Sequence, residues 1–297
     1  LQPPDASHPN INFTTLKWPT IPDAEPPDHL APWFWIKYMI SATLACIRSA
    51  RKENVSALMA FTFGGSIPLI LASAMTGKPL VIFVRSDEAD ELIIKGTPWR
   101  WRKMFSIIEK GAVKRAVGIV AVSKTLSQAL ENRYGKACSR KFSVLYNDLP
   151  TIKTEGDVPT CINALRNENR FILTTSSSLT PRKNIGVLIR AMSELKASNA
   201  HLIVIGDGPD RASLQALAQE LGVEANITFA LWQDNAAALA AHADLFLLPS
   251  FAEGMSNALL EALSADLPCL VSDIPEHREL FQDDIARFDP ASPTELA

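Results

Sequence analysis

Short apolar runs alternate with segments of helical periodicity from residue 33 to the end of the chain. Apolar runs bounded by turn residues predict buried strands, and the periodic segments between them predict crossover helices. Because strands joined through a helix pair in parallel, the pattern predicts a doubly wound α/β fold. The predicted strands are 57–61, 79–86, 118–123 and 141–147 in a first series, and 171–177, 201–206, 226–231, 244–250 and 268–273 in a second.

A polar stretch with two prolines, from about Leu149 to Asn169, separates the two series. Segments of this composition are typical of interdomain linkers. We therefore predict two Rossmann-like parallel-sheet domains, residues 1–148 and residues 170–297, joined by a linker at 149–169.

The composition is that of an ordinary globular protein, with 47% apolar and 21% charged residues. A formal net charge of −3 gives no broad nucleic-acid footprint. The four cysteines form no CxxC pair, and Cys46 and Cys269 lie in apolar runs, so we expect buried thiols. The five histidines are dispersed, and we expect no metal site. The proline-rich start lacks the pattern of a signal peptide.

The most informative stretch, residues 249–273, reads PSFAEGMSNALLEALSADLPCLVSD. A predicted strand enters a short loop that holds Glu253 and Gly254, and a helix follows from about Asn257 to Ala265 before a second strand. This βαβ unit places the loop and the helix N-terminus at the carboxyl edge of a parallel sheet. Open α/β sheets bind ligands at that edge.

The residue types in this loop suit a phosphate beside a polyol. Gly254 allows a ligand to approach the backbone, and the amides of residues 255–257 lie at the positive end of the helix dipole. Glu253 and Glu261, with seven residues between them, add carboxylates, which repel phosphate but accept hydrogen bonds from hydroxyls. This pattern fits a diphosphate that joins ribose to a sugar.

The stretch resembles the EGxxNxxLEAxAxGxPVVxSD signature of retaining, family-4-type glycosyltransferases with the GT-B fold. The resemblance covers nearly the whole chain and is strongest from 171 to 289. It implies two Rossmann-like domains that face a cleft, with the donor in the second. The family's first glutamate contacts the donor sugar and its second holds the ribose, which corresponds to Glu253 and Glu261. Asp266 stands at the helix end, where the family usually has glycine.

Two more loops resemble family motifs. LTPRKN places Arg182 and Lys183 before a helix, and Lys183 matches the family's lysine that neutralises the donor diphosphate. Ser178 stands where the family often has arginine, so either Arg182 compensates or the phosphate contact is weaker. The GDGPD turn resembles the family's turn against which the nucleotide lies. The catalytic candidates are therefore Glu253, Lys183 and Arg182, and the donor-binding candidates are Glu261, Gly254, Met255, Ser256, Asn257, Gly206, Gly208 and Ser178.

In the first domain the resemblance places a sugar-side motif at Arg85 and Asp87, where a strand-end cap with a salt bridge is an equal alternative. Residues 95–116 interleave basic side chains with Trp99 and Trp101. This pattern suits an anionic lipid-linked acceptor at a membrane face, or an ordinary solvated helix face. The aromatic residues 33–35 present a similar choice, with packing on the sheet favoured.

The resemblance implies transfer with retention at the anomeric carbon, no metal and no cofactor beyond the nucleotide-sugar substrate. The implied partners are the donor and a glycan or lipid-linked acceptor of polysaccharide biosynthesis, with no nucleic acid. The expected location is the cytoplasm, with contact to the inner membrane face left open. Two alternatives remain: a GT-B nucleotide-sugar epimerase or hydrolase, and a non-catalytic nucleotide-sugar-binding module.

Both ends of the chain depart from the family. The chain begins with Leu, and only one alternating segment, Ile11–Lys17, precedes the first predicted helix. The last segment, ARFDPASPTELA, resembles the start of a family helix and stops in its first turn. We expect the first strand with its glycine-rich loop and the closing helices to be missing, and the 297-residue chain to be weakly active or inactive.

Overall fold

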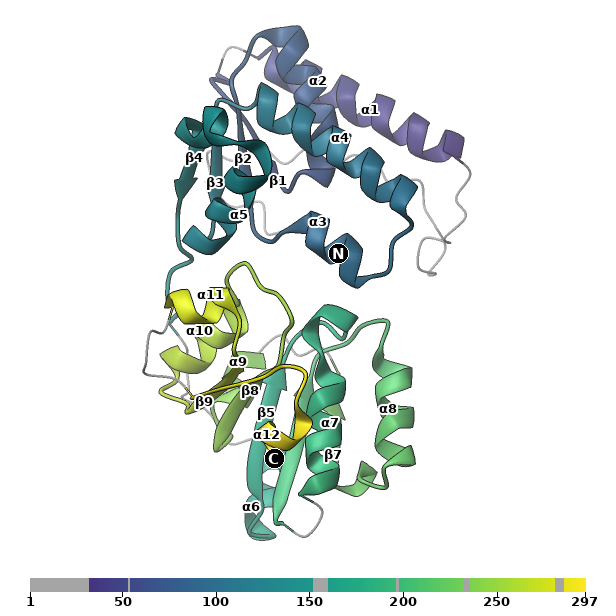
Figure 1. Ribbon diagram of the computed structural model, residues 1–297, viewed down its shortest axis with the longest axis vertical. Helices are drawn as coiled ribbons and strands as arrows, with labels where there is room; N and C mark the ends of the chain where they lie inside the picture. The colour runs from purple at the N-terminus through teal and green to yellow at the C-terminus, as the bar shows by residue number, and fades with distance from the viewer. Residues whose placement is uncertain (1–31, 53, 152–159, 196–197, 232–235, 281–285) are drawn as a thin grey trace. The chain divides into compact units, whose positions relative to one another are not determined.

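The computed structural model describes residues 32–52, 54–151, 160–195, 198–231, 236–280 and 286–297 (Figure 1). The predicted segment Ile11–Lys17 lies outside these residues. By its internal contacts the chain divides into two compact units. One comprises Leu1–Phe83 with Ile107–Ile119, and the other Val84–Ser106 with Val120–Ala297.

The first sheet has the order β1-β2-β3-β4, and each strand coincides with a predicted one. In β2 alternate residues are buried, as expected for a strand whose two faces differ in covering. β1 and β2 are parallel, with Leu58 opposite Leu80. The strands are β1 (Leu58–Phe61), β2 (Leu80–Val84), β3 (Gly118–Ala121) and β4 (Phe142–Val144). The helices are α1 (Pro32–Ala50), α2 (Ile67–Thr76), α3 (Glu88–Ile94), α4 (Trp99–Arg115) and α5 (Lys124–Tyr134), with short 3-10 turns η1 (Gly64–Ser66) and η2 (Lys136–Lys141).

The second sheet has six parallel strands in the order β10-β9-β8-β5-β6-β7. Five of them were predicted, and β10 is additional. The strands are β5 (Phe171–Ser176), β6 (Ala200–Ile205), β7 (Ile227–Ala230), β8 (Leu245–Leu248), β9 (Cys269–Ser272) and β10 (Ala286–Phe288). The helices are α6 (Thr160–Asn167), α7 (Ile185–Glu194), α8 (Arg211–Glu220), α9 (Ala236–Ala240), α10 (Asn257–Ser264), α11 (Pro275–Leu280) and α12 (Pro293–Leu296), with 3-10 turns η3 (Pro181–Lys183) and η4 (Glu224–Asn226).

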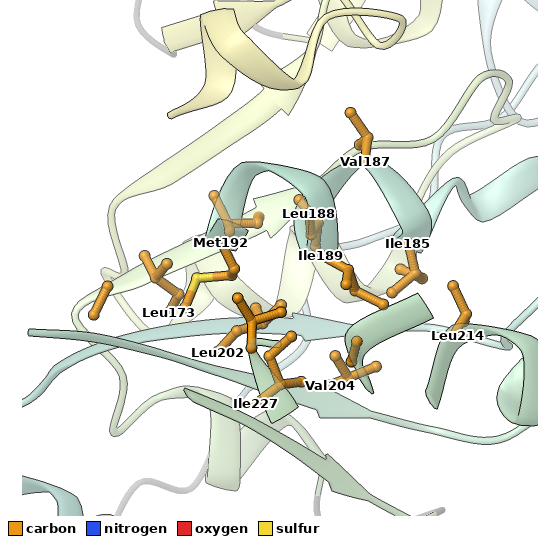
Figure 2. Packing of buried hydrophobic residues seen from close by; sticks show 14 of the residues in the cluster. Leu173, Ile185, Val187, Leu188, Ile189, Met192, Leu202, Val204, Leu214 and Ile227 are labelled. Carbon is orange, nitrogen blue, oxygen red and sulfur yellow. The ribbon is translucent and has the colours of Figure 1, made fainter. Parts of the chain in front are cut away.

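Helices cover both faces of the second sheet. On one face α7 and α8 pack on β5 and β6, and Figure 2 shows the α7 side chains, among them Leu188 and Met192, lying over Leu173 and Leu202. On the other face α6 and α9 cover β5 and β6, while α10 covers β8 and β9. Each fully buried aliphatic side chain stabilises the fold by about 1.5–3 kcal/mol. The doubly wound prediction is therefore confirmed for this sheet.

Helix α6 lies inside the segment that the sequence predicted as a linker. Its Ile162 is fully buried and Leu165, one turn later, packs beside it against Ile172 and Ile203. An apolar pair at this spacing forms one helical face, which the polar composition of the segment hid. The predicted domain boundaries stay a prediction.

Two helix ends in the second sheet adopt left-handed backbone conformations. Gly222 follows α8 with a φ of 62°, as its type and place predict. Asp266 follows α10 with a φ of 54°, at the position where the sequence departs from the expected glycine. Aspartate tolerates this conformation better than most residues, so the helix ends at the same place.

The order of the second sheet fixes where a ligand site can form. Read from β7, it is the 3-2-1-4-5-6 order of dinucleotide-binding folds. Successive strands are added on one side of β5 up to β7 and on its other side from β8 onward, and β5 and β8 are parallel neighbours in the sheet. The loops that follow these two strands therefore lie side by side at the carboxyl edge, with a crevice between them.

Candidate active site

The loops after β5 and β8 bring three predicted catalytic residues together. Arg182 and Lys183 lie in η3, which follows β5, and Glu253 lies between β8 and α10. The Lys183 ammonium lies 2.5 Å from Oε1 of Glu253, and Nη1 of Arg182 lies 3.1 Å from Oε2. Ser250 Oγ donates a further hydrogen bond to Oε1 at 2.6 Å.

This ion cluster is largely withdrawn from solvent. The side chains of Glu253, Lys183 and Arg182 are 5%, 12% and 19% exposed. Burial by itself raises the pKa of Glu253, but the charges of Lys183 and Arg182 and the hydrogen bonds from Lys183 and Ser250 outweigh it. The pKa of Glu253 therefore lies below its ordinary value, and the carboxylate is ionised at neutral pH.

Arg182 is held by more than Glu253. Its Nη1 also donates to the carbonyl of Ala252 at 2.8 Å, and its Nε lies 3.6 Å from Oε1 of Glu91 in α3. Two carboxylates and a carbonyl thus engage the guanidinium. This arrangement suits a residue that holds the Glu253 loop, and its predicted contact with phosphate stays a prediction.

Glu261 differs from Glu253 in that its carboxylate has no partner within the described part of the chain. It lies in α10, one turn beyond the helix start, and is half-buried. Among the described residues no hydrogen bond or ion pair reaches its carboxylate. Burial raises its pKa. A half-buried carboxylate without a protein partner is suited to accept hydrogen bonds from ligand hydroxyls.

The helix that carries Glu261 is capped within the protein. Ser256 is its N-cap, and its hydroxyl accepts from the amide of Leu259 at 3.4 Å. Met255 Sδ accepts from the amide of Asn147 at 2.9 Å, and Asn257 Oδ1 accepts from Asn147 Nδ2 at 2.8 Å. The side chains of the predicted binding residues 255–257 therefore have partners already, and only main-chain contacts to a ligand stay a prediction.

The glycines of the predicted nucleotide turn are required by packing of one loop on another. A Cβ at Gly206 would lie 2.0 Å from the carbonyl oxygen of Ser177, and one at Gly208 would lie 2.4 Å from that of Leu179. The amide of Leu179 donates to Asp207 O at 2.9 Å, which joins the two loops. This packing leaves Ser178 exposed.

Gly254 also faces protein backbone at close range. A Cβ there would lie 1.7 Å from the carbonyl oxygen of Arg85, closer than any side chain permits. Glycine is thus required at 206, 208 and 254 because any larger residue would meet the backbone of a neighbouring segment. The sequence did not reveal this requirement. Contacts between the glycines and a nucleotide stay a prediction.

The geometry of Asp87 is that of a cap with a salt bridge, one of the two roles that the sequence left open. Its carboxylate caps α3 by accepting from the amides of Ala89 and Asp90, at 3.1 and 3.3 Å. Both carboxylate oxygens also accept from Arg133, at 2.9 and 2.6 Å. This carboxylate is occupied, whereas the Arg85 side chain is exposed and has no partner among the described residues.

Sequence reasoning missed a group of buried polar residues behind Glu253. Ser250, Ser272 and His277 are 0%, 0% and 1% exposed. Buried polar side chains at the ends of strands need hydrogen-bond partners, and Ser250 finds Glu253. The sequence did contain a signal for this group. Ser250 follows β8, Ser272 ends β9, and His277 comes five residues later, so polar residues stand at the carboxyl ends of two buried strands.

The described residues contain no group of three or more histidine, cysteine, aspartate or glutamate side chains able to hold a metal ion. Cys46, Cys138 and Cys269 are free thiols, and all three are half-buried, so the expected burial of Cys46 and Cys269 is only partial. Within the described part of the chain, no helix has the length and apolar character needed to cross a membrane.

Comparison with known proteins relates both parts of the chain to glycosyltransferases. Residues 162–297 match the model of glycosyl transferases group 1, and residues 12–149 match glycosyltransferase family 4. Together the two glycosyltransferase models match most of the chain. The predicted GT-B fold agrees with the structure of Anabaena Alr3699/HepE in complex with UDP and glucose, which has a TM-score of 0.72 at 21% identity. That match covers 86% of this chain and 69% of the other.

Two curated relatives match along most of the length of this chain. N-acetyl-alpha-D-glucosaminyl L-malate synthase of Bacillus anthracis is 26% identical over 76% of this chain and 60% of its own. The second is N-acetylgalactosamine-N,N'-diacetylbacillosaminyl-diphospho-undecaprenol 4-alpha-N-acetylgalactosaminyltransferase of Campylobacter jejuni. It is also 26% identical, over 78% of this chain and 59% of its own. The chain therefore spans less than two thirds of the length of either relative.

Proposed function

We propose that this protein transfers a sugar from a nucleotide-sugar donor to an acceptor, with retention at the anomeric carbon and without a metal ion. The observation that carries the proposal is the arrangement at the β5/β8 switch point. There a buried Glu253 is paired with Lys183 and Arg182, and Glu261, on the following helix, has no partner among the residues that the structure describes. The names of the two curated relatives, a glycoside synthase and a sugar transferase, support this reaction class.

Lys183 is suited to serve the sugar side and the phosphate side of a donor at once. An ammonium has three N–H donors, and one of them is directed to Glu253. The others remain for oxygens of a diphosphate. As the bond between sugar and diphosphate breaks, negative charge grows on the diphosphate, and a cation already fixed in a dry site stabilises that charge. Glu253, held behind Lys183, accepts from hydroxyls of the donor sugar.

Glu261 gives the proposal its first test. If it accepts hydrogen bonds from the ribose, Glu261→Ala removes binding shared by the ground state and the transition state. We expect the donor KM to rise about tenfold or more, because hydrogen bonds to a charged group contribute roughly 1.5–3 kcal/mol, while kcat changes little. Glu220→Ala, at an exposed glutamate of α8, is the matched control and should leave both constants unchanged.

The measurement is donor turnover by the full-length protein with UDP-, GDP- and ADP-sugars, with the product anomer read by NMR. Retention requires the product to keep the anomeric configuration of the donor. Donor consumption that needs no acceptor would instead identify a hydrolase or epimerase. Binding without turnover would identify a nucleotide-sugar-binding module. A donor KM that Glu261→Ala leaves unchanged would remove Glu261 from the ribose site.

For the acceptor we propose a glycan or lipid-linked saccharide reached at an anionic membrane surface. The exposed face of α4 supports this part of the proposal. Trp99 and Ile107 are 64% and 65% exposed, and they lie among the exposed basic residues Arg100, Lys103 and Lys110. Aromatic and basic side chains on one helix face bind the headgroup region of anionic bilayers. The undecaprenol-linked substrate in the name of the Campylobacter relative agrees with such an acceptor.

Vesicle flotation tests the membrane contact. We expect the full chain to bind vesicles of phosphatidylglycerol and not of phosphatidylcholine, with binding reduced by salt. The double variant Trp99→Ser, Ile107→Ser should lose most of this binding. Leu231→Ser, at an apolar residue that is 51% exposed outside α4, should retain it. Equal binding by both variants would show that α4 is an ordinary solvated helix.

A further inference from the structure

The loop that carries Glu253 is tied to β9 by a side chain in place of a backbone bond. Pairing between β8 and β9 ends at Leu248 opposite Val271. The next residue of the first strand is Pro249, which has no N–H to continue the ladder. Instead, Ser272 Oγ donates to the carbonyl of Ser250 at 2.6 Å. The Ser250 hydroxyl then donates to Oε1 of Glu253, also at 2.6 Å.

His277 stands behind this pair of serines and has a defined tautomer. Its Nδ1 lies 2.8 Å from the carbonyl oxygen of Ser272. A carbonyl only accepts, so Nδ1 carries the hydrogen and Nε2 is an acceptor. Nε2 is buried and has no hydrogen-bond partner among the described residues. Burial lowers the pKa of His277, and the charged groups that face it are Glu253, Lys183 and Asp273, so the ring is neutral at pH 7.

Every hydrogen in this series points toward Glu253. His277 Nδ1 donates to the carbonyl of Ser272, the Ser272 hydroxyl donates to the carbonyl of Ser250, and the Ser250 hydroxyl donates to the Glu253 carboxylate. All three donor residues are at most 1% exposed, so these links lie away from solvent. We propose that His277 is a positioning residue whose Nδ1–H, through Ser272 and Ser250, fixes the orientation of the Glu253 carboxylate. The part that Glu253 plays toward the donor rests on the proposed function.

The proposal predicts a particular change at Glu253. Without the His277 N–H, the carbonyl of Ser272 keeps only its bond from the amide of Ile274, at 3.0 Å. We expect the side chain of Ser272 to shift and the Ser250 hydroxyl to meet Oε1 at a poorer geometry. The hydrogen bond from Ser250 is one cause of the lowered pKa of Glu253, together with Lys183 and Arg182. Glu276 also faces Glu253, and its negative charge acts in the opposite direction. Loss of the Ser250 bond therefore raises the pKa of Glu253.

Two amide variants separate the two ring nitrogens. In His277→Asn the side-chain NH2 lies near the place of Nδ1, whereas in His277→Gln it lies near that of Nε2. We expect His277→Asn to keep the wild-type kcat within about threefold and His277→Gln to lower it about tenfold, the effect of one lost charge-directed hydrogen bond. Nucleoside-diphosphate affinity should stay unchanged in both. The acid limb of the kcat profile should move to higher pH in His277→Gln, as it does in Ser250→Ala.

The double variant Ser250→Ala, His277→Gln tests the order of the links. Because both changes break the same series, its acid limb should match that of Ser250→Ala alone. Additive shifts would overturn the proposal, since His277 would then act elsewhere. So would a wild-type pH profile in His277→Gln, or full activity in His277→Gln with loss in His277→Asn.

A readout without turnover keeps this inference separate from the proposed function. The free energy of unfolding is measured against pH for His277→Asn and His277→Gln, neither of which titrates at this position. Because the pKa of Glu253 is depressed in the folded state, this group stabilises the fold fully above its pKa in the unfolded state. That stabilisation is lost as pH falls through its pKa in the folded state. The loss should occur at higher pH in His277→Gln, and this difference should vanish when Glu253→Gln is added. A difference that persists in the Glu253→Gln background would overturn the inference, whereas absent donor turnover by the wild type would overturn only the proposed function.

Discussion

Replacing Lys183 by alanine is expected to lower kcat on the order of 10²-fold, with a smaller rise in the donor KM. The reason is that the negative charge on the diphosphate is larger in the transition state than in the ground state. The diphosphate gains negative charge as the bond to the sugar breaks, so the ammonium stabilises the transition state more than the ground state. Donor kinetics of the full chain measure both constants. A change confined to KM would show that Lys183 only binds the donor.

Lys183 also balances the charge of Glu253, and a double variant separates the two effects. Lys183→Ala removes the nearest cation from a buried carboxylate, so the pKa of Glu253 rises and stability at neutral pH falls. Adding Glu253→Gln removes that uncompensated charge. We expect the double variant to regain stability and not kcat. Recovery of kcat in the double variant would mean that Lys183 acts only by neutralising Glu253.

Glu253→Gln is expected to abolish most transfer while leaving affinity for a nucleoside diphosphate no weaker than in the wild type. The carboxylate accepts from both cations, and the amide releases them. Freed from Glu253, Lys183 and Arg182 offer more positive charge to a diphosphate. Calorimetric titration measures the affinity, and donor turnover measures the transfer. Weaker diphosphate binding in Glu253→Gln would show that Glu253 serves to hold the cations in place for the phosphate.

The same variant should unfold more easily. Removing one partner from a buried ion pair destabilises a protein by about 3–5 kcal/mol, and the partial exposure of Arg182 favours the lower end. The folded pKa of Glu253 is depressed, so its contribution is full above the ordinary pKa of glutamate and is lost as pH falls through the folded pKa. The stability difference between wild type and variant should therefore shrink on acidification. A difference that grows toward low pH would contradict the ion pairing.

The place of the site could be predicted from the sequence because strand–loop–helix units put their loops at one sheet edge. From the sequence, both the motif around Glu253 and Glu261 and the loop before α7 were predicted to lie at that edge. The contact between Lys183 and Glu253 could not be predicted, because it depends on β5 and β8 being neighbours. Strands far apart in the sequence become neighbours through the whole chain path, which no local pattern contains.

Other features were hidden because the deciding contacts are tertiary. The glycines at 206 and 208 were interpreted as ligand-facing, yet each lies against the backbone of the loop after β5. Asp87 fitted a sugar-side motif by its place after a strand, and its geometry is that of a helix cap paired with Arg133. In both cases the structure shows a packing or capping role that the sequence did not reveal, and contact with a ligand stays a prediction.

Titration of the full chain with UDP, GDP and ADP tests the central claim most directly. A nucleotide-sugar site at the β5/β8 edge predicts that one of these diphosphates binds with a stoichiometry of about one, since the proposed site is single. Lys183→Ala and Glu261→Ala should each weaken that binding, and Glu253→Gln should not. Failure of the folded wild-type protein to bind any of the three, or binding that Lys183→Ala and Glu261→Ala leave unchanged, would contradict the account.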